Sequence, residues 1–293
     1  MAQVEVNGFN LEYEWHGDRT NPPIIGIHGF THQLICWPRT FIEGITGAGY
    51  SFVVFDSREI GLSTPDENAE SPDISGVLDG TAEYHLPYTI EDMATDTISL
   101  MDALNIEKAQ VVGYSIGGYK ALLAALDAPE RITSVTTINS SALSPNLPLG
   151  DDDLIQATIE ICFPFENREE FSDRLGDLTD FYNGRKYGYT TEEQNAEIIA
   201  KYDRGWYADG IARHALAILR RKQRFEEFEK IKQPTLIVHG TEDCFFSKAH
   251  AQDLLSRLPD ARLATINGAG HALTNALSEV IMPAIVGHLD AAH

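Results

Sequence analysis

The chain has 293 residues, of which 43% are hydrophobic and 9% aromatic, a composition typical of a globular protein that buries a sizeable core. Its 44 acidic and 22 basic residues give a formal net charge of −22, which disfavours nucleic acid and anionic membranes as partners. We expect one large domain, or one domain with an inserted lobe, that acts on a neutral or cationic small molecule.

The N-terminal segment and the cysteines favour a cytoplasmic protein. Residues 1–8 contain no basic region followed by an apolar run, so they do not predict a secretory signal, and no stretch has the apolar length of a membrane span. Cys36, Cys162 and Cys244 are odd in number and widely spaced, which predicts neither a disulfide framework nor a metal site. We expect buried, unreactive thiols, no cofactor, and a monomer or homodimer.

The chain opens with a predicted β-hairpin. Residues 4–6 and 11–15 alternate between apolar and polar side chains on either side of Asn7-Gly8, a pair that favours the tight turn between antiparallel strands.

After the hairpin, short apolar runs alternate with helical patterns. The apolar runs predict strands at residues 24–27, 52–55, 109–112, 132–138, 235–238 and 262–266. The helical patterns lie at residues 37–48, 89–104, 116–127, 248–258 and 274–289. This alternation implies βαβ units, and therefore an α/β fold with a mostly parallel central sheet flanked by helices.

Two stretches depart from that alternation. Residues 64–87 are rich in Asp, Ser, Pro and Gly and predict a long loop. Residues 139–230 lack any buried-strand run and show helical patterns, which predicts a helical cap inserted between two core parts, residues 1–138 and 231–293. We expect most aromatic residues of the cap to form its own core and a minority to face a pocket; they are Phe163, Phe165, Phe171, Phe181, Tyr182, Tyr187, Tyr189, Trp206 and Tyr207.

Residues 113–117 read Gly-Tyr-Ser-Ile-Gly between a predicted strand and a predicted helix. This pattern is typical of a nucleophile elbow, in which Ser115 sits on a sharp turn that holds its hydroxyl out of the backbone. Gly113 and Gly117 lack the Cβ atoms that would collide there, and the following helix directs unpaired N–H groups toward developing negative charge. Taken alone, the pattern also fits an ordinary Gly/Ser loop.

Polar residues at three strand ends support the elbow. Ser115, Asp243 and His271 each follow a different predicted strand, and the carboxyl ends of parallel strands meet at one edge of a sheet. Their order along the chain, serine, acid, histidine, matches the α/β-hydrolase arrangement. His271 is the predicted general base, and Asp243 is predicted to orient it, with Glu242 as the alternative acid.

Over almost its whole length the sequence therefore resembles the α/β-hydrolase superfamily, which implies that fold and an acyl-enzyme mechanism. Several motifs are similar to the branch that contains the aclacinomycin methylesterases and related carboxylesterases: His28-Gly29, Trp37-Pro38, Phe41 and Asp56-x-Arg58-x-x-Gly61-x-Ser63-Thr64. The position of Asp243 relative to Gly240 also follows the family pattern. Tyr114 departs from the branch, and its bulk beside the serine predicts a different pocket.

The fold implies two backbone donors for the oxyanion, the N–H groups of Phe30 and Ile116. We expect His28 to be a structural turn residue and His32 a surface residue rather than a pocket residue. Asp56 and Arg58 are expected to form an ion pair that fixes their turn.

Enzymes of this fold that catalyse other reactions carry different residues at the corresponding positions. Dehalogenases and epoxide hydrolases carry an aspartate where this chain has Ser115, and residues 30–33 lack the turns typical of carbon–carbon bond hydrolases and perhydrolases. We therefore predict a serine esterase that cleaves a small to medium neutral carboxylic ester without a cofactor. Lactone hydrolysis remains close behind, and carbon–carbon bond hydrolysis or perhydrolysis on the same fold remains an alternative. A receptor-like protein with a vestigial triad also remains open, and turnover of a simple ester distinguishes it.

Overall fold

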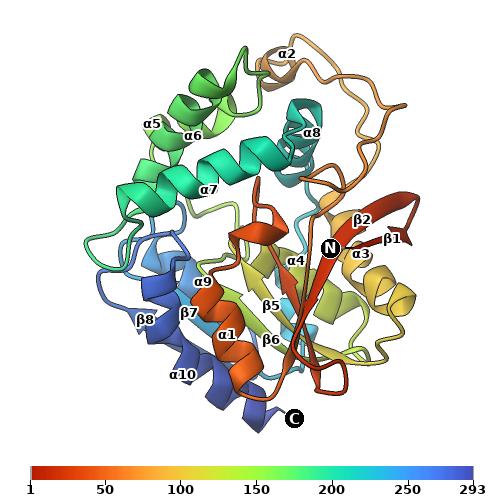
Figure 1. The fold of residues 1–293 in the computed structure, drawn as a ribbon, viewed down its shortest axis with the longest axis vertical. Coiled ribbons are helices and arrows are strands. Elements are labelled where there is room, and N and C mark those ends of the chain that lie inside the picture. Colours follow the sequence, from red (N-terminus) through yellow and green to blue (C-terminus); the bar gives the residue numbers. More distant parts are fainter. Residues whose placement is uncertain (1, 293) are drawn as a thin grey trace.

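The computed structural model describes residues 2–292 and contains an eight-stranded sheet with helices on both faces (Figure 1). In chain order the strands are β1 (Ala2–Val6), β2 (Phe9–His16), β3 (Pro23–Ile27), β4 (Ser51–Phe55), β5 (Ala109–Tyr114), β6 (Ile132–Ile138), β7 (Thr235–Gly240) and β8 (Ala261–Ile266). Across the sheet their order is β1-β2-β4-β3-β5-β6-β7-β8.

The sheet is mostly parallel, as predicted. β2 pairs antiparallel with β1 and β4, and every other pair, from β4 to β8, is parallel. Asn7 and Gly8 form the turn of the first hairpin with φ angles of 49° and 85°, which is the left-handed geometry that this turn requires. The predicted hairpin is therefore confirmed.

Two layers of helices cover the sheet and bury its two faces. One face packs against α1 (Arg39–Gly47) and α10 (Asn275–Ala291), and the other against α3 (Ile90–Ala103), α4 (Ile116–Asp127) and α9 (Lys248–Arg257). Each predicted core helix is present, with ends within two residues of the prediction. Thr89 begins α3 with a capping box that also uses Asp92, and such a cap satisfies amide groups that the first turn leaves free.

The long loop predicted at residues 64–87 contains a short helix, α2 (Ile74–Leu78). Asp73 caps it by accepting a hydrogen bond from the amide of Gly76 at 2.9 Å. Five residues are too few to display a helical period, so the sequence pattern does not reveal this element.

Four helices lie between β6 and β7: α5 (Asp152–Glu160), α6 (Arg168–Tyr182), α7 (Thr191–Arg204) and α8 (Ala208–Leu219). We call them the cap. Together with α2 they lie over the carboxyl ends of the parallel strands, at the top of Figure 1. Phe171, Leu175 and Ile198 are among the side chains of a small apolar core within the cap. Two short 3-10 helices, η1 (Leu34–Cys36) and η2 (Phe225–Lys230), complete the regular elements.

Candidate active site

Ser115 occupies a sharp turn between β5 and α4. Its φ and ψ angles are 55° and −128°, a conformation that costs a residue other than glycine about 1–3 kcal/mol. The neighbouring backbone leaves no room for side chains. A Cβ atom on Gly117 would lie 2.0 Å from the carbonyl oxygen of Ile27, and one on Gly113 would lie 2.3 Å from that of Gly117. The strand, tight turn and helix predicted around Ser115 are therefore present.

The structure brings Ser115, His271 and Asp243 together at one edge of the sheet. His271 Nε2 lies 3.0 Å from Ser115 Oγ, and His271 Nδ1 lies 2.9 and 3.0 Å from the two carboxylate oxygens of Asp243. A carboxylate only accepts hydrogen bonds, so Nδ1 carries the hydrogen and Nε2 is free to accept the serine proton. All three residues are buried.

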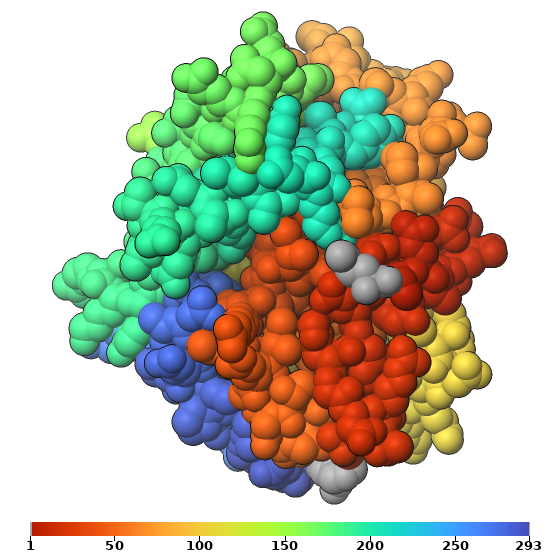
Figure 2. All heavy atoms as spheres, in the orientation of Figure 1, coloured from red at the N-terminus to blue at the C-terminus, as the bar shows by residue number. Residues whose placement is uncertain are grey.

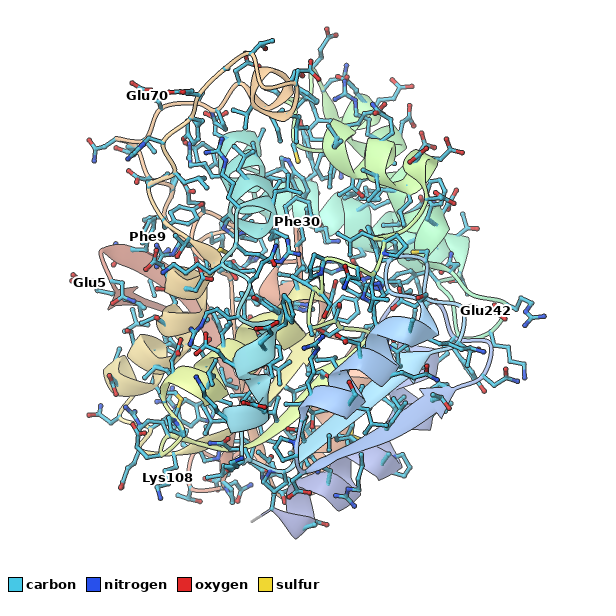
Figure 3. The ribbon with its side chains drawn as sticks, turned by 180° about the vertical axis from the view of Figure 1, so that it is seen from behind. Glu5, Phe9, Phe30, Glu70, Lys108 and Glu242 are labelled. Atoms are coloured by element: carbon cyan, nitrogen blue, oxygen red, sulfur yellow. The ribbon has the colours of Figure 1, made fainter. Side chains whose placement is uncertain are left out.

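Asp243, rather than Glu242, faces the histidine. Asp243 Oδ1 also accepts hydrogen bonds from the amides of Phe245 and Phe246, both at 2.9 Å, which hold the carboxylate in place. Glu242 points away and forms an ion pair with Arg185 at the periphery of the molecule, far from Phe30 in Figure 3. Hydrogen bonds from Arg185 lower the pKa of Glu242. The alternative acid is therefore wrong.

Tyr114 and Asn139 hold the loop that carries His271. The Tyr114 hydroxyl donates to the carbonyl oxygen of His271 at 2.8 Å, and Asn139 Nδ2 donates to the carbonyl oxygens of Gly270 and His271 at 3.0 Å. Asn139 Oδ1 accepts from the amide of Gly240 at 2.9 Å, so the same side chain also joins the ends of β6 and β7. Sequence reasoning missed this role of Asn139; its position directly after a buried strand was the available signal.

The side chain of Tyr114 packs in the apolar cluster beneath α1 and α10, on the face of the sheet away from α4. Tyr114 does not line the cavity beside Ser115, and the predicted difference from the branch's pocket stays a prediction. Successive residues of a strand point to opposite faces, and Tyr114 is the last residue of β5.

Two backbone N–H groups lie beside the serine. Ile116 is the first residue of α4, where amide groups have no partner within the helix. Phe30 follows Gly29, at which a Cβ atom would lie 2.8 Å from Ser115 Cβ, so only glycine lets this loop approach so closely. Figure 3 labels Phe30 where the core meets the cap. Within residues 2–292, neither amide forms a backbone hydrogen bond.

His32 is buried and lines the pocket, so the predicted surface position is wrong. Its Nδ1 donates to the carbonyl oxygen of Phe30 at 2.8 Å, which means that Nδ1 carries the ring hydrogen. Burial, with a further contribution from the charge of Lys201, lowers the pKa of His32 to about 3. The ring therefore stays neutral at physiological pH.

His28 packs as a buried ring, in keeping with a structural role. Its ring centre lies 4.4 Å from that of Trp37 and 5.4 Å from that of His32, and neither ring nitrogen has a hydrogen-bond partner among residues 2–292. Burial, together with neighbouring cationic groups, lowers the pKa of His28 well below its usual range.

Asp56 and Arg58 do not pair with each other, so the predicted ion pair is wrong. Asp56 faces the cap and pairs with Arg204 of α7, and it also accepts a hydrogen bond from the amide of Leu34 at 2.7 Å. Arg58 turns to α3, where its Nε lies 2.7 Å from a carboxylate oxygen of Asp96. The turn after β4 directs the two side chains to different elements, and sequence proximity does not reveal those partners.

Buried polar contacts hold the cap on the loops that follow β3 and β4. We call these contacts the cap junction. They comprise the Asp56–Arg204 and Glu59–Arg213 ion pairs and the side chain of Gln33, which donates to two carbonyl groups near the end of α7. In the Glu59–Arg213 pair both side chains are 0% exposed. Figure 2 shows the teal cap helices lying directly against the orange N-terminal segments.

A cavity of about 220 Å³ lies between the Ser115–His271 pair and the cap. Its inner wall includes Ser115, His271, Phe30, Ile116, Phe245 and Phe246, and its outer wall includes Ile74, Leu78, Ile155, Ile159, Ile218 and Leu219. Among the described residues that line it there is no Asp, Glu, Lys or Arg. Tyr182 is the one lining residue among the nine cap aromatics named in the sequence analysis.

The thiols are poor nucleophiles. Cys162 lines the cavity, and burial raises its pKa to about 12. Burial, followed by the charge of Asp243, raises the pKa of the half-buried Cys244 to about 12 as well. Within residues 2–292, no three His, Cys, Asp or Glu side chains are grouped so that they could hold a metal ion, and no helix has the length and apolar character needed to cross a bilayer.

Comparisons with known proteins agree with this geometry. Residues 22–161 match the family model described as alpha/beta hydrolase fold. Rhodomycin D methylesterase of Streptomyces peucetius is 27% identical over 294 residues, which cover 94% of this chain and 93% of that protein.

Two solved structures share the fold over nearly the whole of both chains. A meta-cleavage product hydrolase from Pseudomonas fluorescens IP01 has a TM-score of 0.75 at 18% identity, with 100% of this chain and 98% of that chain covered. The enol-lactonase from Burkholderia xenovorans LB400 has a TM-score of 0.73 at 22% identity, with 99% and 100% covered.

Proposed function

We propose that this chain, which has the α/β-hydrolase fold, cleaves a small to medium, uncharged carboxylic ester through an acyl-enzyme on Ser115. The observation that carries this proposal is the chain of hydrogen bonds from Ser115 through His271 to Asp243, at the floor of a cavity without charged side chains. The likeness to a methylesterase over almost the whole chain supports the choice of ester hydrolysis.

In the first half of the reaction, His271 Nε2 takes the hydroxyl proton as Ser115 Oγ attacks the ester carbonyl carbon. A serine hydroxyl needs such a base because it is a weak nucleophile at neutral pH. The amides of Phe30 and Ile116 donate to the oxyanion, and loss of one such donor typically costs about 3 kcal/mol. When the tetrahedral intermediate collapses, the C–O bond to the alcohol breaks and His271 returns the proton to the leaving oxygen.

In the second half, water repeats the sequence on the acyl-enzyme. His271 takes a proton from the water as its oxygen attacks the acyl carbon, and it then protonates Ser115 Oγ as the carboxylic acid departs. Asp243 keeps the imidazole in one tautomer and stabilises its cation in both halves. The two backbone amides that bind Asp243 Oδ1 keep that carboxylate oriented.

The test compares the purified protein with Ser115→Ala on p-nitrophenyl butyrate. We expect turnover to fall by more than about a thousandfold, because removal of a triad nucleophile has an effect of that order or greater. A decrease of less than about a hundredfold would count against the acyl-enzyme. Circular dichroism of both proteins checks that the variant is folded.

Hydrolysis of a lactone is the second candidate, because ring opening forms the same acyl-enzyme with the alcohol still attached to the acyl group. The uncharged cavity favours this candidate as much as an open-chain ester. Rates on a lactone and on the open ester with the same number of carbons distinguish the two. A receptor-like protein would hydrolyse neither.

A further inference from the structure

The outer wall of the cavity is aliphatic and comes from three separate elements. Ile74 and Leu78 belong to α2, Ile155 and Ile159 belong to α5, and Ile218 and Leu219 end α8. The inner wall, by contrast, carries Ser115 and His271. A ligand that reaches from the triad to the cap therefore passes from polar to apolar surroundings.

The polar side chains that α5 and the residues just after it contribute to the cavity already use their hydrogens in hydrogen bonds. The Thr158 hydroxyl donates to the carbonyl oxygen of Leu154 at 2.8 Å, and Cys162 Sγ donates to the carbonyl oxygen of Thr158 at 3.5 Å. Both hydrogens are thus donated to carbonyl groups of α5. A ligand carboxylate or other hydrogen-bond acceptor placed against α5 would lose its hydration without a matching donor, which is unfavourable.

The cavity suits a chain of limited length. Its volume of about 220 Å³ is below the range of roughly 300–1,000 Å³ typical of pockets for drug-sized ligands. With ~30 Å³ for a group the size of a water molecule, it has room for about seven such groups.

The far end of the cavity opens at two leucines. Leu78 and Leu219 line the cavity, yet these residues are 42% and 52% exposed, so they mark its mouth. The loop that carries α2 is tied to α8, because Ser71 donates to Asp209, Arg213 donates to the carbonyl oxygen of Glu70, and Arg220 donates to that of Tyr84. These contacts hold the α2 wall against α8.

We infer that one half of the substrate ester is an unsubstituted aliphatic chain of about six to eight carbons, which extends from Ser115 along α5 and α8 toward Leu78 and Leu219. This inference rests on the proposed esterase activity. The chain is either the acyl or the alcohol half of the ester. Both have the same chemistry against the outer wall, and the experiment separates them.

The experiment measures kcat/KM for two series of esters. Ethyl alkanoates vary the acyl half and alkyl acetates vary the alcohol half, so that ethyl octanoate and octyl acetate are isomers. In one series we expect kcat/KM to rise about fourfold per methylene, the factor for burial of one CH₂ group, and to level off near six to eight carbons. A hydroxyl or carboxylate at the end of a shorter chain, which does not reach the exposed mouth, should lower kcat/KM at least about tenfold.

Two variants test whether the aliphatic chain of the substrate lies against the outer wall. Ile159→Phe adds bulk to the outer wall, so the ratio of kcat/KM for the eight-carbon chain to that for the two-carbon chain should fall at least about tenfold. Ile199→Phe is the matched control: it makes the same exchange at an isoleucine of α7 that is 40% exposed and outside the cavity lining, and the ratio should not change.

The outcomes separate this inference from the proposed function. Turnover that depends on Ser115 but is flat with chain length in both series, or a ratio that Ile159→Phe does not change, would overturn the aliphatic chain and leave the esterase in place. Absence of Ser115-dependent turnover throughout would overturn the esterase itself. A rise of kcat/KM with chain length in the alkyl acetates alone would support the proposed aliphatic chain and assign it to the alcohol half of the ester.

Discussion

The cap meets the core in two regions of opposite character. At the cap junction, buried ion pairs join α7 and α8 to the loops after β3 and β4. At the outer wall of the cavity, the cap presents aliphatic side chains and no charge. Ion pairs and hydrogen bonds require defined geometry, whereas an aliphatic wall tolerates changes of shape. The cap junction therefore fixes where the cap lies, and the outer wall determines which substrate it accepts.

The largest effect on stability is expected when an ion pair of the cap junction is broken. Glu59→Gln leaves the fully buried guanidinium of Arg213 without its counter-charge, and loss of one partner of a buried pair typically costs about 3–5 kcal/mol. We expect the free energy of unfolding in urea to fall by that amount. Glu43→Gln is the control, because it removes the same charge from the exposed Arg39–Glu43 pair and should cost less than about 1 kcal/mol. Equal losses of unfolding free energy in the two variants would contradict the conclusion that the cap junction fixes the position of the cap.

Acid should also destabilise the protein, because histidines near the cap junction are buried in the neutral form. Burial, followed by the positive charges of Lys120, Arg58 and Arg213, lowers the pKa of His214 to about 3; Tyr88 packs against the ring. In the unfolded chain this histidine binds a proton near pH 6.5, its ordinary pKa, and in the folded chain it does not until about pH 3. The free energy of unfolding therefore falls as the pH drops through this window, by up to about 1.4 kcal/mol per pH unit for each such histidine.

The change of unfolding free energy with pH should be smaller in His214→Gln by the contribution of about one proton, since the residue no longer titrates. Urea unfolding from pH 4 to pH 7 measures the slope for both proteins. His28 and His32 remain in the variant, so part of the slope should persist. An unchanged slope in His214→Gln would show that this imidazole is not the group that takes up the proton.

The smallest effect on stability is expected at the mouth of the cavity. Leu219→Ala removes a side chain that is 52% exposed, so the free energy of unfolding should stay within about 0.5 kcal/mol. The wider mouth should move the preferred chain length of the esters upward. A large loss of stability would mean that the outer wall, like the cap junction, holds the cap in position.

The sequence predicts the parts of the fold and site that depend on local patterns. Runs in which apolar and polar residues alternate, and short runs that are wholly apolar, indicate the strands. The glycines on either side of Ser115 indicate the sharp turn, because a Cβ atom at Gly113 or Gly117 would collide with the backbone. The order of Ser115, Asp243 and His271 then indicates which strand ends meet.

The errors concern partners that only the packed cap defines. Asp56 pairs with Arg204, which is 148 residues away in the sequence, rather than with nearby Arg58. His32 is buried where the core meets the cap and so reaches the pocket. The aliphatic outer wall likewise depends on how α2, α5 and α8 pack together, and the period of each helix gives no information on that packing.

Trapping the acyl-enzyme tests directly whether Ser115 is the nucleophile. The protein is mixed with p-nitrophenyl octanoate, quenched in acid within milliseconds, digested and analysed by mass spectrometry. We expect one octanoyl group, on the peptide that contains Ser115, and none in Ser115→Ala. Sustained turnover with no acyl group at Ser115, or with the group on another residue, would contradict the mechanism.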